Sequence, residues 1–180
     1  MKIRREEGFT LIELLIVVAI IGIIAAIAVP GLLRARMSGN EASAIGSIRT
    51  IASAEATYAS SCGGGGYAQS LADLGKAPAG GAAVAFIPAD LAGAVLGAAA
   101  TAKSGYGFAI GAGPAGAQVL AAASTCNVAA AASQTQFFAQ GDPVTPGTTG
   151  VRFFGTNETG MIRQNTAALT NAMNTGTPLQ

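Results

Sequence analysis

The chain contains no histidine and few charged residues. Charged side chains make up 11% of its 180 residues, whereas hydrophobic ones make up 51%. Without histidine the chain lacks the commonest metal ligand and the commonest general base at neutral pH, so it cannot form a Ser-His-Asp or Cys-His catalytic site alone. A disordered chain is excluded too, because such chains are poor in hydrophobic residues. We therefore expect one folded domain that is not an enzyme.

The charges show no excess of one sign. The chain has ten Lys and Arg residues and nine Asp and Glu residues. From residue 61 onward the four basic side chains equal the four acidic ones in number (Lys76, Lys103, Arg152, Arg163 against Asp73, Asp90, Asp142, Glu158). Because duplex binding needs a dense positive surface, we expect no nucleic-acid partner.

Cysteine is scarce as well. Cys62 and Cys126 are too few and too far apart for a zinc site. In an oxidising compartment a disulfide between them would close a long loop and stabilise the fold by roughly 4 kcal/mol. The alternative is a pair of buried free thiols. We predict the disulfide.

One long apolar run lies near the N-terminus. Phe9 to Val29 reads FTLIELLIVVAIIGIIAAIAV, and Glu13 is its single charge. As a helix the run would be about 31 Å long, enough to cross the hydrocarbon core of a bilayer. Lys2, Arg4 and Arg5 precede it, so the positive-inside rule predicts a cytoplasmic N-terminus.

Simpler interpretations of this run remain open. Ala26-Ile27-Ala28 has the form of a signal-peptide cleavage site, although the run exceeds the usual length of roughly 7–15 residues. A plain membrane anchor leaves Glu13 unexplained, because a carboxylate is costly inside a membrane. Thr10 and Glu13 also have the spacing of a capping box. A cap explains why the carboxylate is tolerated, but not the Gly-Phe junction before it.

That junction carries a resemblance to a known family. The segment GFTLIELLIVV, Gly8 to Val18, follows a short basic leader and resembles the N-terminus of type IV prepilins and of the related pseudopilins of type II secretion. The strong resemblance covers about the first third of the chain, and a fainter one covers Gly150 to Arg163.

The resemblance implies a processing pathway, and we expect the chain itself to bind no cofactor and no metal. A membrane prepilin peptidase would cut after Gly8 and methylate the new amino group of Phe9. Glu13 corresponds to a glutamate that neutralises this amino group in a neighbouring subunit. Gly22 and Pro30 correspond to positions around which the membrane helix can lose regular hydrogen bonding in the filament, and proline itself lacks an amide hydrogen.

Cleavage would also leave a neutral subunit. Residues 1–8 carry three basic and two acidic side chains, so ten minus three and nine minus two leave seven of each sign. Copies of such a subunit pack with little net repulsion.

The helical pattern continues beyond Pro30 with one apolar face. Residues on that face recur near every 3.6 positions (Leu33, Met37, Ala44, Ile48, Ile51, Glu55, Tyr58), and polar residues lie between them (Arg34, Arg36, Asn40, Glu41, Ser47, Arg49). The glycines at 63–66 then end the helix. We expect a leader at 1–8, a membrane and filament-core helix at 9–30, its amphipathic continuation at 31–60 and a globular head at 61–180.

The head shows short strand-like runs. They lie at Gly105–Ile110, Gln118–Ala121, Gln136–Gln140, Gly150–Phe154 and Met161–Gln164, and Gly155–Gly160 has the composition of a hairpin loop. Short helices are expected at Leu71–Leu74 and Ala89–Leu96. The chain is therefore predicted to have an α+β fold, in which a long N-terminal helix packs on a small antiparallel sheet as in type IV pilins.

Three further motifs are weak. Gly111–Gly116 has the G-x-G-x-x-G form of a dinucleotide site and precedes helix-prone residues 117–123, but no acidic residue follows at the required distance. Asn157-Glu158-Thr159 matches a glycosylation sequon and, more simply, a turn. Asp142 and Glu158 are two scattered candidates for calcium ligands. We assign no metal to the chain.

These observations favour a structural subunit over a catalyst. The resemblance implies a major pilin of a type IV pilus, used for adhesion and twitching motility. Its partners would be copies of itself, the prepilin peptidase and an inner-membrane assembly platform. It would lie in the inner membrane before assembly and in the extracellular pilus afterwards. The alternatives are a pseudopilin of type II secretion, a minor pilin, and more distantly a membrane-anchored periplasmic binding domain.

Overall fold

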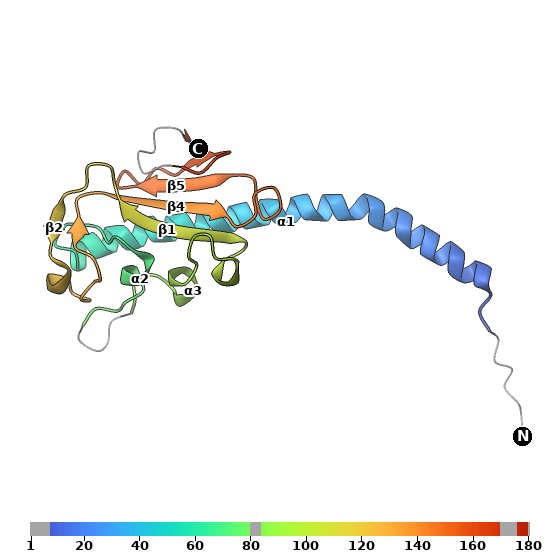
Figure 1. Cartoon of the computed structure of the whole chain (residues 1–180), viewed down its shortest axis with the longest axis horizontal. Helices are drawn as coiled ribbons and strands as arrows, with labels where there is room; N and C mark the ends of the chain where they lie inside the picture. The colour runs from blue at the N-terminus through green and yellow to red at the C-terminus, as the bar shows by residue number, and fades with distance from the viewer. Residues whose placement is uncertain (1–7, 80–83, 170–175, 180) are drawn as a thin grey trace, which may run out of the picture. The chain divides into compact units, whose positions relative to one another are not determined.

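The computed structural model describes residues 8–79, 84–169 and 176–179 (Figure 1). The chain divides into two compact units, Met1–Arg36 and Met37–Gln180. The predicted leader lies outside the described residues except for Gly8, and so do its basic residues Lys2, Arg4 and Arg5.

Helix α1 begins at Leu11 and ends at Ser61. In the first unit, every described residue from Gly8 to Arg36 is exposed, apolar side chains included. The helix remains regular at Gly22 and through Pro30, which lies inside it. An exposed apolar surface of this size needs a partner outside the subunit, such as lipid or another protein surface.

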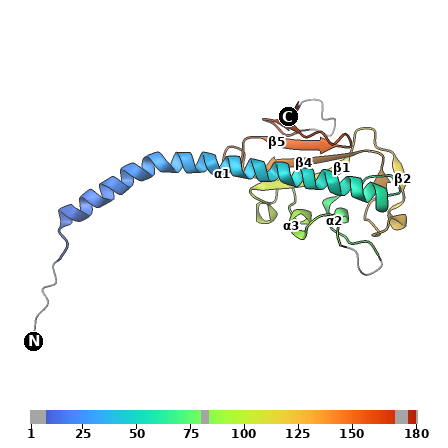
Figure 2. The ribbon, with the colours of Figure 1, turned by 180° about the vertical axis from the view of Figure 1, so that it is seen from behind.

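In the second unit, α1 buries one face. The buried residues recur three or four positions apart (Glu41, Ala44, Ser47, Ile48, Ile51, Ala54, Glu55, Tyr58). The hydrophobic ones among them belong to a core that also holds Leu74, Leu91 and Phe154, and Figure 2 shows α1 lying across one face of the sheet. The predicted apolar face is confirmed in this unit, but Leu33 is 51% exposed, and Glu41 and Ser47 are buried rather than polar surface residues.

The sheet is antiparallel throughout. Among the described residues it has five strands in the order β1-β4-β5-β6-β7 (Tyr106–Ala112, Phe137–Pro143, Phe153–Asn157, Arg163–Asn165, Thr177–Pro178). Strands β2 (Gln118–Leu120) and β3 (Ser133–Gln134) form a separate pair. Short helices complete the unit: α2 (Leu71–Leu74), α3 (Ala89–Ala92), η1 (Ala99–Thr101) and η2 (Ala122–Ser124). The predicted α+β fold is confirmed.

Two predicted element boundaries are wrong for identifiable reasons. The strand expected at Gly150–Phe154 begins only at Phe153, because the N–H groups of Val151 and Arg152 donate to Glu41 Oε1 (2.9 and 3.1 Å). The strand then continues to Asn157, so the connecting turn is shorter than expected. The helix expected at Ala89–Leu96 ends at Ala92, because the next residues pair with β1 through Leu96 N–H and Phe108 O (3.1 Å).

The glycines after α1 end it as predicted. Gly64 and Gly65 have φ angles of 64° and 94°, which side-chain-bearing residues rarely adopt. Gly63 donates to the carbonyl of Tyr58 (2.8 Å) and Gly65 to that of Ala59 (2.9 Å), so the last helical carbonyls keep hydrogen-bond partners. The chain therefore turns directly after Cys62.

Candidate functional site

The N-terminal motif forms a capped helix start. Gly8, Phe9 and Thr10 precede the first turn of α1, and the side chain of Phe9 is 82% exposed. The Thr10 amide and hydroxyl both donate to Glu13 Oε2 (3.0 and 2.6 Å), while Glu13 N–H donates to the Thr10 hydroxyl (3.3 Å). The reciprocal bonds are those of a capping box, as the spacing predicted.

This cap occupies only one oxygen of Glu13. Both Thr10 donors meet Oε2, and within the described residues Oε1 accepts no hydrogen bond. The carboxylate is therefore held in place while retaining a free oxygen. A cationic group from outside the chain can reach that oxygen without breaking the cap. The cap and a functional role are thus compatible, although the sequence made them appear as alternatives.

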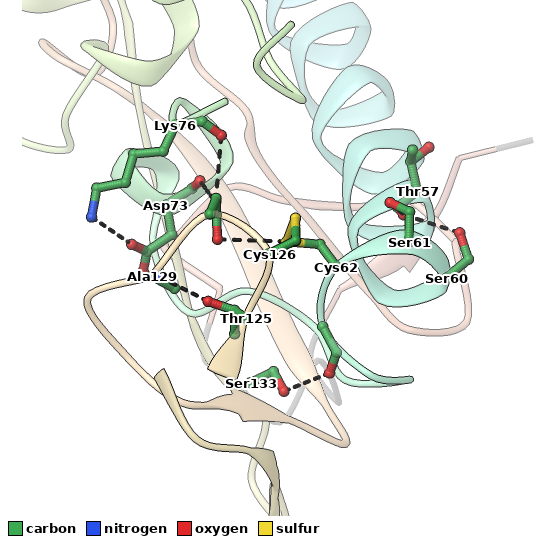
Figure 3. The surroundings of a disulfide bond; sticks show 12 residues. Thr57, Ser60, Ser61, Cys62, Asp73, Lys76, Thr125, Cys126, Ala129 and Ser133 are labelled. Carbon is green, nitrogen blue, oxygen red and sulfur yellow. Dashed lines mark hydrogen bonds and ion pairs between the residues drawn. A yellow bond between two sulfur atoms is a disulfide. The ribbon is translucent and has the colours of Figure 1, made fainter. Parts of the chain in front are cut away.

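A disulfide closes the second unit at the end of α1. Cys62 and Cys126 are bonded, and their Cα atoms lie 4.8 Å apart (Figure 3). Asp73 holds the loop around Cys126. The Asp73 side chain accepts from Ala130 N–H (2.6 Å), and the Asp73 carbonyl accepts from Asn127 Nδ2 (2.7 Å). The disulfide therefore joins the helix to a loop that is already well bonded.

A charged pair fixes α1 against the start of β5. Arg152 Nε and Nη2 each lie 2.7 Å from Glu41 Oε2, and Arg152 Nη1 donates to Gln164 Oε1 (2.7 Å). The guanidinium also lies 5.5 Å from the ring centre of Phe154. Burial alone would raise the pKa of Glu41, but hydrogen bonds from Val151 and Arg152 outweigh it and lower the pKa. The carboxylate is thus held ionised.

Glu55 is a second acid on the buried face of α1. It is fully buried, its Oε2 accepts from Ala68 N–H (2.8 Å), and its Oε1 has no hydrogen-bond partner among the described residues. Burial raises its pKa to about 8, the Ala68 bond opposes this, and the charge of Asp73 adds to it. At neutral pH Glu55 is therefore mainly protonated.

The weaker sequence motifs do not form binding sites. Gly111–Gly116 connects β1 to β2, not a strand to a helix, so the dinucleotide interpretation is wrong; residues 117–123 form β2 and η2 instead of a helix. Gly113 serves packing, because a Cβ at this position would lie 2.6 Å from Gln136 Cβ. Asn157 and Thr159 lie in the β5–β6 turn, where Asn157 Oδ1 accepts from Thr159 N–H (3.2 Å).

The two calcium candidates are not brought into a metal centre. Asp142 lies in β4 and Glu158 in the turn after β5, and within the described residues no group of three or more His, Cys, Asp or Glu side chains could hold a metal ion. Burial raises the pKa of Asp142 to about 6. Sequence reasoning missed the roles of Glu41 and Asp73, because their partners lie 111 and 57 residues away and no local pattern links them.

Helix α1 is long and apolar enough to cross a membrane, and no residue of its most apolar stretch is buried. Residues 3–29 match the prokaryotic N-terminal methylation motif. The chain is 60% identical, over 38 residues or 21% of its length, to the type IV wide pilus major component PilA4 of Thermus thermophilus. Over 54 residues, 30% of the chain, it is 43% identical to the type IV major pilin protein PilA of Myxococcus xanthus.

The likeness is confined to part of each protein. The matched segments span 29% and 24% of the two relatives, respectively. No solved structure matches the chain. The methylation motif, the two pilin relatives and a long apolar helix that continues onto an antiparallel sheet together support membership of the type IV pilin family.

Proposed function

We propose that the chain is the major structural subunit of a type IV pilus. The observation that carries this proposal is the methylation motif at the start of a helix whose described residues up to Arg36 are all exposed. Such an apolar helix is unstable in water alone, so the subunit needs lipid before assembly and other subunits afterwards. Polymerisation into a filament for adhesion and surface motility places the helix among other subunits.

Processing precedes assembly in this proposal. A prepilin peptidase in the membrane cuts after Gly8 and methylates the amino group of Phe9. The junction lies before the first turn of α1, and both residues are exposed, so a protease can bind it as extended chain without unwinding the helix. Glu13 Oε1 then pairs with the methylated amino group of a neighbouring subunit, since Oε2 is held by Thr10.

The membrane-stored subunit has a defined orientation in this proposal. Residues 1–8 lie in the cytoplasm, α1 crosses the inner membrane, and the second unit lies outside, where its disulfide is stable. Arg34 and Arg36 follow the apolar run and are exposed, as expected for side chains at the level of lipid headgroups. An inner-membrane assembly platform extracts the processed subunit into the filament.

The test is mass spectrometry of the N-terminal peptide from material sheared off intact cells, with the membrane fraction as control. We expect a peptide that begins at N-methylated Phe9 in the sheared fraction. The same peptide confined to the membranes would indicate a pseudopilin or a minor pilin. A start at Val29, or an intact Met1, would overturn the proposal, because the first indicates an ordinary secreted protein and the second a permanent anchor.

A further inference from the structure

Most charges of the second unit are paired inside the subunit. Three ion pairs join side chains of this unit: Lys76 with Asp73 (3.5 Å), Lys103 with Asp90 (3.0 Å) and Arg152 with Glu41 (2.7 Å). These pairs account for three of the basic and three of the acidic residues. Any charge of this second unit that is used between subunits must come from the remainder.

The remaining charges are few, and most of them are unsuited to a partner. Glu55 is fully buried, and Asp142 is half-buried in β4 with one oxygen enclosed. Arg163 donates to the carbonyl of Gly176 (2.8 Å). Across the described residues from 37 onward, this leaves one exposed cation and one exposed anion without a partner, Arg49 and Glu158.

Arg49 lies at a groove on the exposed side of α1. The groove has a volume of about 390 Å³ and is lined by Arg49, Thr50, Ser53, Ala54, Thr57 and Phe86. The ring of Phe86 packs edge-on against the buried ring of Tyr58, with centroids 5.4 Å apart, so the apolar wall is fixed. The groove offers one positive charge, hydroxyl groups and an aromatic surface.

Glu158 lies at the tip of the β5–β6 hairpin. The turn is braced internally, because Asn157 Oδ1 accepts from the amide (3.2 Å) and the hydroxyl (2.6 Å) of Thr159. Gly160, with φ of 72°, completes it. Met161 follows and is 45% exposed. The tip therefore presents an acidic and an apolar side chain on a preformed loop. These complement the positive charge and the aromatic surface of the groove.

We propose that the Glu158 hairpin tip of one subunit docks in the Arg49 groove of a second copy of this chain. The inference rests on the proposed pilin function, because it names a contact between neighbouring subunits of the filament. A helical homopolymer requires two different faces of one subunit to be complementary, since a self-complementary face closes into a dimer. The unpaired anion and cation lie on two different elements and meet this requirement.

The contact governs which surfaces meet more than how tightly they bind. An exposed ion pair contributes little by itself. A pair enclosed between two subunits is shielded from water, and reversing one of its charges places two like charges together, which opposes the contact. Because the contact repeats at every subunit, a small loss in each one lowers filament yield strongly.

Charge reversal in the full chain tests the inference. We expect Arg49→Glu and Glu158→Arg each to lower the yield of sheared filaments at least tenfold, and the combination of both to restore it to within about threefold of the original. The matched control combines Glu158→Arg with Arg36→Glu, which has the same net charge but places the acid elsewhere on α1. We expect no restoration from it. Processed Phe9 peptide and an intact disulfide in the membrane fraction verify that each variant folds.

The outcomes separate this inference from the proposed function. Single variants that assemble normally, a matched combination that stays deficient, or an equal recovery with Arg36→Glu would each overturn the docking contact while filaments of the original chain persist. Failure of the original chain to form any filament would instead contradict the proposed function, and with it this contact.

A conservative variant gives a second measurement. Arg49→Lys keeps the charge and supplies an amine, so carbodiimide treatment of its filaments should couple position 49 to Glu158 of another copy. Peptide mass spectrometry should detect this link in Arg49→Lys filaments and not in filaments that also carry Glu158→Gln. Filaments of Arg49→Lys without the link would overturn the inference.

Discussion

The two units of the chain obtain their stability in opposite ways. Residues 8–36 form a helix whose apolar side chains are all exposed, and its polar contacts are confined to the cap between Thr10 and Glu13. Residues from 37 onward enclose a core and carry a disulfide and three ion pairs. The exposed apolar surface of the first unit therefore needs partners outside the chain, whereas the second unit buries its apolar core through its own contacts. Substitutions in the first should affect assembly, and those in the second should affect folding.

The largest expected effect comes from Glu13, and it should be on assembly alone. Glu13→Val removes the oxygen proposed to pair with a neighbouring amino group, so we expect insertion and cleavage to proceed while filament yield falls to near zero. Sheared filaments and processed Phe9 peptide in membranes measure the two steps. Glu13→Asp, which keeps the charge on a shorter side chain, should retain part of the yield. Normal yield from Glu13→Val as the only subunit would disprove the pairing.

The disulfide should have the largest effect on the second unit. Replacing Cys62 and Cys126 by Ser removes a link across 64 residues and should lower the free energy of unfolding by roughly 4 kcal/mol. Urea unfolding of the full chain in detergent, followed by tyrosine fluorescence, measures this. The helix of residues 8–36 should keep its far-ultraviolet signal through the transition. An unchanged midpoint would show that the bonded loop needs no covalent link.

The Glu41–Arg152 pair should rank next. Arg152→Ala leaves a buried carboxylate with only its two amide donors, and we expect the free energy of unfolding to fall by about 3 kcal/mol. The same urea experiment measures it. Arg163→Ala is a matched control from the same sheet, since it removes an arginine bonded to one carbonyl, and should cost about 1 kcal/mol. Equal losses in both variants would contradict a special role for the pair.

The contrast between the units also explains what the sequence could predict. The first unit depends on local features: the capping spacing of Thr10 and Glu13, the length of the apolar run and the motif around Gly8. The buried face at Ile48, Ile51 and Tyr58 was predictable too, because helical periodicity places these residues together. These features need only neighbours within a few turns of one helix.

What the sequence did not predict depends on distant partners. The helical periodicity places Glu41 on the polar side of α1, yet Arg152, 111 residues later, makes its burial favourable. The backbone N–H groups of Val151 and Arg152 also donate to Glu41, and these bonds delay the start of β5 to Phe153. Strands β3 and β7 have two residues each, too few for an alternation to be visible. The disulfide was predictable only because the chain has one possible cysteine pair.

The smallest effect, measured over one pH unit, is a pH dependence that should arise in the second unit alone. Burial raises the pKa of Glu55 from its ordinary value of 4.5 to about 8, so between these values the folded chain keeps a proton that the unfolded chain releases. Stability is therefore complete below the ordinary value and falls as pH rises through 8, by about 1 kcal/mol per pH unit. Asp142, whose pKa is about 6, gives the same sign at lower pH, so the interval from pH 7 to 8 isolates Glu55. Urea midpoints measured across that interval should fall for the original chain and stay level for Glu55→Gln, which keeps an acceptor for Ala68 N–H without a titrating group. An equal slope in both proteins would mean that another group releases the proton.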